Sequence, residues 1–107
     1  MLVSVLFGVR VATFEAARAA VEHTLDIVLD ERESSHYGGV YFRFNGPNVQ
    51  ELVLQENIEI PEMDPAEEDF PEQRYLLYMS GSPKDSPFLA ALEASPELFK
   101  KLRTRER

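Results

Sequence analysis

The strongest constraint on the fold is a stripe of apolar residues at helical spacing near the start of the sequence. The stripe recurs every three or four residues and comprises Phe14, Ala17, Val21, Leu25 and Val28. Thr13 precedes the stripe as a candidate N-cap, and Glu15 places an anion in the first turn, where the helix dipole favours it. The spacing therefore predicts a long helix from about Thr13 to Glu31.

Short apolar and β-branched runs predict the strands of a sheet. There are four such runs, at residues 2–7, 40–44, 51–55 and 75–79. Turn-forming residues at 45–48 separate the second run from the third and predict a hairpin over residues 40–58. If Phe44 and Leu52 pair with both side chains facing the core, Arg43 lies opposite Val53 and diagonal to Glu51.

Two serine-proline pairs, Ser86-Pro87 and Ser95-Pro96, predict short helices near the end of the chain. Basic residues in segment 100–107 would then lie at a helix C-terminus, where cations are favoured. The order of elements predicts an α+β fold in one domain, residues 1–107. We expect about four strands in a mainly antiparallel sheet, packed on one long N-terminal helix and short C-terminal helices.

The composition limits the classes of partner. The 107 residues include no cysteine and carry a formal net charge of −8. Because segment 100–107 holds five of the bases, residues 1–99 contain 18 acids against 6 bases. Such a body repels nucleic acid and attracts basic proteins. No apolar run reaches the roughly 18 residues that span a bilayer, and a signal peptide is not indicated, so we expect no membrane contact.

The acidic excursion, residues 59–73, is the main candidate for partner binding. Three prolines there stiffen the chain, which lowers the entropy lost on docking, and two large apolar residues lie among the acids as candidate anchors. The candidate residues of the excursion are Glu59, Glu62, Met63, Asp64, Glu67, Glu68, Asp69, Phe70 and Glu72. Tyr41 and Arg43, on the exposed face of the hairpin, complete this surface. The alternative interpretation is a solvated loop that only increases solubility.

Catalytic and metal-binding motifs are absent from the sequence. It contains no nucleophile elbow, phosphate-cradling loop, dinucleotide fingerprint, calcium loop or zinc motif, so we predict no catalytic residues, metal or cofactor. A cluster of His36, Tyr37, Tyr41 and Arg43 is the alternative ligand site, because these groups can hold an anion or donate a proton. These side chains can equally end a helix, begin a strand and face water.

Four short segments carry a resemblance to a known class of proteins. They are residues 37–43 (YGGVYFR), 51–57 (ELVLQEN), 68–72 (EDFPE) and 76–78 (LLY). Over residues 32–82 the chain resembles small acidic bacterial proteins similar to the immunity proteins that neutralise toxins. The resemblance implies a non-enzymatic, cytoplasmic inhibitor whose acidic surface blocks a cationic toxin domain, often a nuclease. The basic segment 100–107 departs from that pattern.

Three functions therefore remain open at the level of sequence. The first is an immunity-type inhibitor that binds a basic protein through the acidic excursion. The second is a small-molecule-binding or enzymatic domain with its site at the cluster around His36. The third is a structural subunit of a homo-oligomer, paired through an edge strand or through the surface of residues 88–102.

Overall fold

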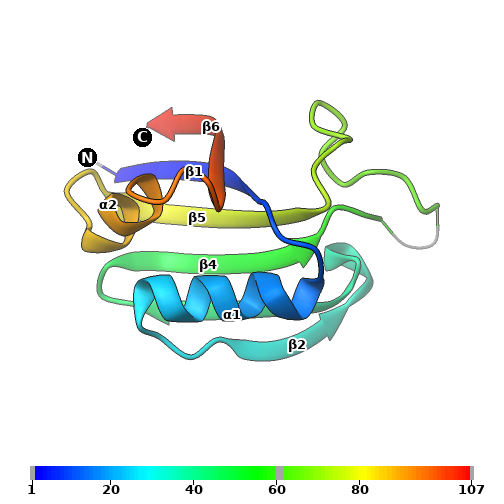
Figure 1. Ribbon diagram of the computed structural model, residues 1–107, viewed down its shortest axis with the longest axis horizontal. Coiled ribbons are helices and arrows are strands. Elements are labelled where there is room, and N and C mark those ends of the chain that lie inside the picture. Colours follow the sequence, from blue (N-terminus) through cyan, green and yellow to red (C-terminus); the bar gives the residue numbers. More distant parts are fainter. Residues whose placement is uncertain (1, 60–61, 107) are drawn as a thin grey trace.

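Figure 1 shows the computed structural model of the protein, which describes residues 2–59 and 62–106 apart from the Ser35 side chain. The elements follow in the order β1 (Leu2–Val9), α1 (Phe14–Leu25), β2 (Asp30–Ser34), the 3-10 turn η1 (Ser35–Tyr37), β3 (Gly39–Gly46), β4 (Val49–Glu56), β5 (Tyr75–Pro83), α2 (Pro87–Glu93) and β6 (Phe99–Glu106). All strand pairs are antiparallel, in the spatial order β2-β3-β4-β5-β1-β6.

The α+β architecture agrees with the sequence, but the count of elements does not. The described residues form six strands, where the sequence predicted about four, and their two helices are both short. The additional strands, β2 and β6, are the two edges of the sheet. Neither was predicted as a strand, and the sequence placed residues 30–31 of β2 and the segment of β6 in helices, because edge strands bury few side chains and so lack the apolar alternation that identifies a strand.

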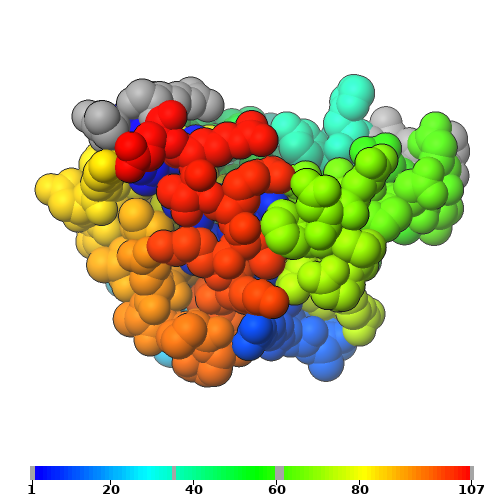
Figure 2. Space-filling view, turned by 90° about the horizontal axis from the view of Figure 1, so that it is seen from above, coloured from blue at the N-terminus to red at the C-terminus, as the bar shows by residue number. Residues whose placement is uncertain are grey.

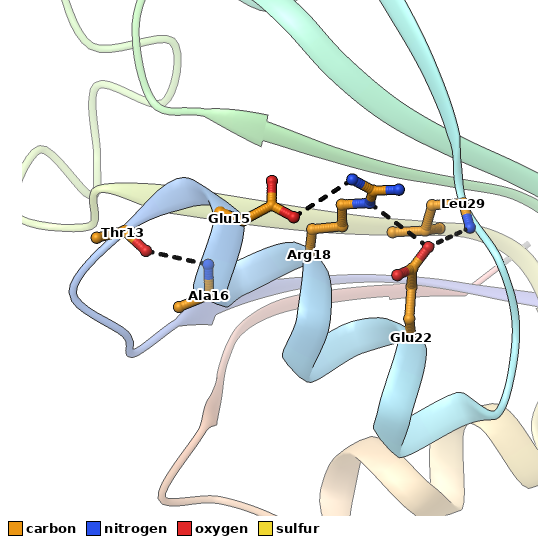
Figure 3. A network of polar contacts seen from close by, with 6 residues as sticks. All are labelled: Thr13, Glu15, Ala16, Arg18, Glu22 and Leu29. Carbon is orange, nitrogen blue, oxygen red and sulfur yellow. Dashed lines mark hydrogen bonds and ion pairs between the residues drawn. The ribbon is translucent and has the colours of Figure 1, made fainter.

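The first helix is shorter than its apolar stripe predicts. Thr13 caps its start as expected, since the Thr13 hydroxyl oxygen accepts a hydrogen bond from the Ala16 amide at 3.0 Å (Figure 3). The helix ends at Leu25 because Asp26 adopts a left-handed conformation, with φ 55°. Glu22 then holds the segment that follows the helix, because its carboxylate accepts a hydrogen bond from the Leu29 amide at 2.8 Å (Figure 3). Residues 30–31, which the prediction included in this helix, belong to β2.

The end of the chain also differs from the prediction. Ser86 does cap α2, its hydroxyl accepting the Phe88 amide at 3.1 Å. Ser95 starts only a single turn, in which its carbonyl accepts the amides of Leu98 and Phe99. The chain then continues as β6 along β1, so its basic residues lie on an edge strand and not at a helix C-terminus.

The hydrophobic core lies between the sheet and the two helices, which cover the same face in Figure 1. The largest fully buried side chains include Phe7, Leu52, Leu77 and Phe99 from the strands, together with Leu92 from α2. The hairpin register is the predicted one, with Phe44 paired to Leu52 and Arg43 to Val53. Because neighbouring residues in a strand point to opposite faces, this register assigns Arg43 and Val53 to the face without helices, called the open face below.

Candidate functional site

The chain between β4 and β5, called the acidic loop (residues 57–74), is organised around one side chain, Asn57. The Asn57 Nδ2 donates hydrogen bonds to the carbonyls of Phe70 at 2.9 Å and Gln73 at 2.8 Å. Its Oδ1 accepts the Glu67 amide at 2.8 Å. The Asn57 amide also donates to the Arg74 carbonyl, which closes the base of the loop. The side-chain amide of Asn57 thus uses both of its donors and its acceptor to hold the backbone of Glu67, Phe70 and Gln73.

Most acids of the loop point into solvent. Those with exposed side chains are Glu59, Glu62, Asp64, Glu68, Asp69 and Glu72. Within the described part of the chain none of these six forms an ion pair. Glu67 differs, since it is half-buried and pairs with Arg103 of β6. This pair ties the loop to the edge of the sheet, and Figure 2 shows residues of the loop lying against β6.

Met63 lies on a strained turn of the loop. Its side chain is 65% exposed, although it is apolar, and its backbone has φ 63°, the left-handed region that non-glycine residues seldom adopt. Hydrogen bonds hold the turn, from the Met63 amide to the Glu59 carbonyl and from the Glu59 amide to the Asp64 carbonyl, both at 2.7 Å. Strain of this kind costs about 1–3 kcal/mol and concentrates at functional sites. Phe70, the other expected anchor, is half-buried.

The loop folds back towards the open face of the sheet. One row of paired residues crosses all six strands on this face, namely Asp30, Arg43, Val53, Tyr78, Leu6 and Arg103. Two shallow depressions flank the row and share Tyr78 and Ser80 in their walls. One, of about 380 Å³, extends towards Arg103 and Arg105, and the other, of about 340 Å³, extends towards the acidic loop.

Tyr78 lies at the centre of that face, and its hydroxyl has a raised pKa. Partial burial is the main cause, nearby Glu67 adds to it and Arg103 opposes it, so the pKa of Tyr78 rises from 10.0 to about 12. Like any tyrosine, Tyr78 presents a neutral ring and a hydroxyl group at physiological pH. The position of Tyr78 on this face was not predictable, because residues 75–79 are apolar on both faces, as in any inner strand.

The predicted cluster around His36 is only partly assembled. The rings of Tyr37 and Tyr41 are in contact, with centroids 4.3 Å apart. Arg43 turns to its own hairpin, donating to Asn45 at 2.8 Å and to Glu51 at 3.1 Å. His36 and Tyr37 line the depression of about 340 Å³, whereas Tyr41 and Arg43 are outside its walls. Of the four residues in the predicted cluster, only His36 and Tyr37 therefore lie in the same depression as residues of the acidic loop.

The described ranges, residues 2–59 and 62–106, contain neither a metal-binding cluster nor a membrane-spanning helix. No group of three or more acidic or histidine side chains in these ranges is arranged to hold a metal ion. No helix there is long and apolar enough to cross a membrane.

Comparison with known proteins gives no further assignment: no family model, no curated protein and no solved structure matches this chain.

Proposed function

We propose that this protein is a protein-binding module, an immunity-type inhibitor that uses its acidic loop to block a basic toxin partner. The observation that carries the proposal is the construction of the loop. Asn57 hydrogen-bonds its backbone, six exposed acids form no ion pair with any described residue, and the apolar Met63 stands exposed on a strained turn.

The physical argument concerns both the rate and the strength of association. Unpaired acids on one loop give a negative field that steers a cationic partner and raises the association rate. Because Asn57 already bonds to the backbone of Glu67, Phe70 and Gln73, this part of the loop loses little conformational entropy on docking. Met63 then supplies an apolar contact surrounded by charge, the arrangement that is typical of binding hot spots. Inhibition follows by occlusion, since the loop covers the surface on which it docks.

The exposed face of the hairpin extends the proposed surface. Tyr41 and Arg43 lie on strand β3 and share the open face with Val53. Arg43 is engaged by Glu51, at 3.1 Å, so its charge is largely satisfied within the protein. We therefore propose that Tyr41 makes the larger contact with the partner in this part of the surface. Arg43 instead holds the hairpin through its bonds to Asn45 and Glu51.

The test measures association with a cationic toxin domain, taken from a reading frame beside the gene. We expect the association rate to fall about tenfold or more between roughly 50 mM and roughly 500 mM salt, and the toxin to lose activity when bound. The double variant Glu62→Gln/Glu68→Gln should associate about three- to tenfold more slowly at low salt.

The control is the double variant Asp85→Asn/Glu97→Gln, which removes the same charge from two exposed acids outside the loop. It should retain most of the association rate. An equal loss in both variants would show that net charge and not the loop is responsible. A complex with a salt-independent rate, or a toxin domain left fully active, would contradict the proposal.

A further inference from the structure

The depression between the acidic loop and the open face of the sheet has the chemistry of a cation-binding site, called the receptacle below. Its volume is about 340 Å³, and its walls come from η1, β4, β5 and the loop. The residues that matter are Glu51, Gln55, Glu59, Tyr37, Tyr78 and Ser80. The β4 and β5 residues meet through strand pairing, Tyr37 comes from η1, and Glu59 is contributed by the loop.

Hydrogen-bond acceptors predominate in these walls. Two carboxylates line the depression, and neither Lys nor Arg does. Glu59 forms no ion pair with any described residue, while Glu51 is bonded through one oxygen to Arg43 and keeps its second oxygen available. Of the two carboxylates only Glu51 has an ion pair with a described residue, and the single ionisable group of basic type among the described wall residues is the imidazole of His36.

Gln55 adds an amide to the wall. The residue is only 3% exposed and lines the depression. Its Nε2 donates to the carbonyl of its chain neighbour Glu56 at 3.3 Å, and its side-chain oxygen accepts no hydrogen bond from the described residues. This oxygen is not among the fully buried atoms without a partner, so a donor that enters the depression can reach it.

Two aromatic rings, Tyr37 and Tyr78, complete the walls. Aromatic faces attract cations, and arginine stacks on them more readily than lysine does. A planar group with several donors matches two carboxylates, an amide oxygen and two rings better than the compact ammonium group of lysine.

We propose that this depression binds a guanidinium group, presented as an arginine side chain by the basic partner. The identity of the partner rests on the function proposed above, but binding of the guanidinium group can be tested on the isolated protein. Glu59 and Glu51 would accept its N–H groups, Gln55 would accept a further donor, and the tyrosine rings would stack on its plane.

The test is a titration of the isotope-labelled protein with N-acetyl-arginine methylamide, followed by amide chemical shifts. We expect saturable shifts confined to residues around the depression, such as Val53 and Tyr78, with a dissociation constant on the order of millimolar. The citrulline analogue, which is neutral and of similar shape, should produce no saturable shift, and the lysine analogue should bind several-fold more weakly.

Glu59→Gln is the diagnostic variant, since Glu59 is exposed and the fold does not depend on its charge. It should weaken binding of the arginine analogue about fivefold or more. Asp85→Asn removes the same charge from an exposed residue of another segment and should leave the binding unchanged. The proposal is wrong if the citrulline analogue binds equally well or if the two variants have equal effects. It is also wrong if the chemical-shift changes are spread over the whole surface.

Further results show whether the guanidinium group comes from a small molecule or from a partner side chain. They also distinguish failure of this proposal from failure of the inhibitor proposal. Free arginine that binds tenfold more tightly than the capped analogue would assign the receptacle to a small molecule, against the partner side chain proposed here. If the arginine analogue does not bind while the toxin domain is still inhibited, the receptacle is wrong and the inhibitor proposal stands. Binding of the capped analogue without toxin inhibition supports the receptacle chemistry and refutes the inhibitor.

Discussion

Replacing Asn57 by alanine should release the acidic loop while leaving the sheet intact. The substitution removes three hydrogen bonds to loop backbone, at 2.9, 2.8 and 2.8 Å. Each such bond contributes a net 0.5–1.5 kcal/mol, so the sum is about 3 kcal/mol. The loop lies at the surface, where water can replace some of these partners. We therefore expect the free energy of unfolding to fall by about 2 kcal/mol.

The assay combines urea unfolding with amide hydrogen exchange. The Glu67 amide donates directly to Asn57, so its exchange should accelerate in Asn57→Ala. The exchange rates of amides in the centre of the sheet, such as that of Leu54, should change only as much as the change in global stability requires. Loss of order should also reduce the association rate with the toxin domain, because a disordered loop pays its ordering entropy on binding.

A matched control is Asn45→Ala, which removes an asparagine with side-chain hydrogen bonds of its own, from Arg43 and to the Gln50 carbonyl. It lies at the end of the hairpin and should not change the exchange of Glu67. If Asn57→Ala left both the unfolding free energy and the Glu67 exchange as they are in the unaltered protein, the loop would not be held by this side chain. The argument for a preorganised surface would then fail.

The other two predictions concern the sheet and the helix. Because the pKa of Tyr78 is raised from 10.0 to about 12, the unfolded chain ionises first, so stability is complete below pH 10 and falls between pH 10 and about 12. The difference between the unaltered protein and Tyr78→Phe in urea unfolding should therefore shift by at most about 3 kcal/mol across that range, and a pH-independent difference would contradict the raised pKa. Thr13→Ala removes the hydroxyl that caps the Ala16 amide and should cost about 1 kcal/mol in thermal unfolding; an unchanged midpoint would mean that the cap contributes nothing.

Elements with an apolar side were predictable from the sequence. Thr13 as N-cap, the Phe44–Leu52 register and the Ser86 cap are all present in the structure. Each depends on contacts within a few residues or on alternating burial, which local sequence encodes. The six-stranded sheet was not predictable in the same way. In β2, residues Asp30–Ser34, four of five side chains are exposed, so the segment becomes a strand only through its hydrogen bonds to β3.

The candidate site shows the same division. The acids of the loop are visible in the sequence as a run of charge, and Met63 stands out among them. The role of Asn57 is not visible, because it bonds to residues 10 to 16 positions further along the chain, through backbone groups that any sequence possesses. The receptacle is equally hidden, since Tyr37, Gln55 and Tyr78 belong to separate elements. Long-range packing alone places them together.

The position of β1 in the sheet has a consequence for how the protein is made. Leu6 pairs with Tyr78 on one side and with Arg103 on the other, so both neighbours of the first strand are encoded late in the chain. During synthesis β2, β3 and β4 can assemble as a meander while β1, apolar and unpaired, waits for its partners. A ribosome that pauses before β5 would therefore hold an incomplete sheet with an exposed hydrophobic strand, a state that is prone to aggregate.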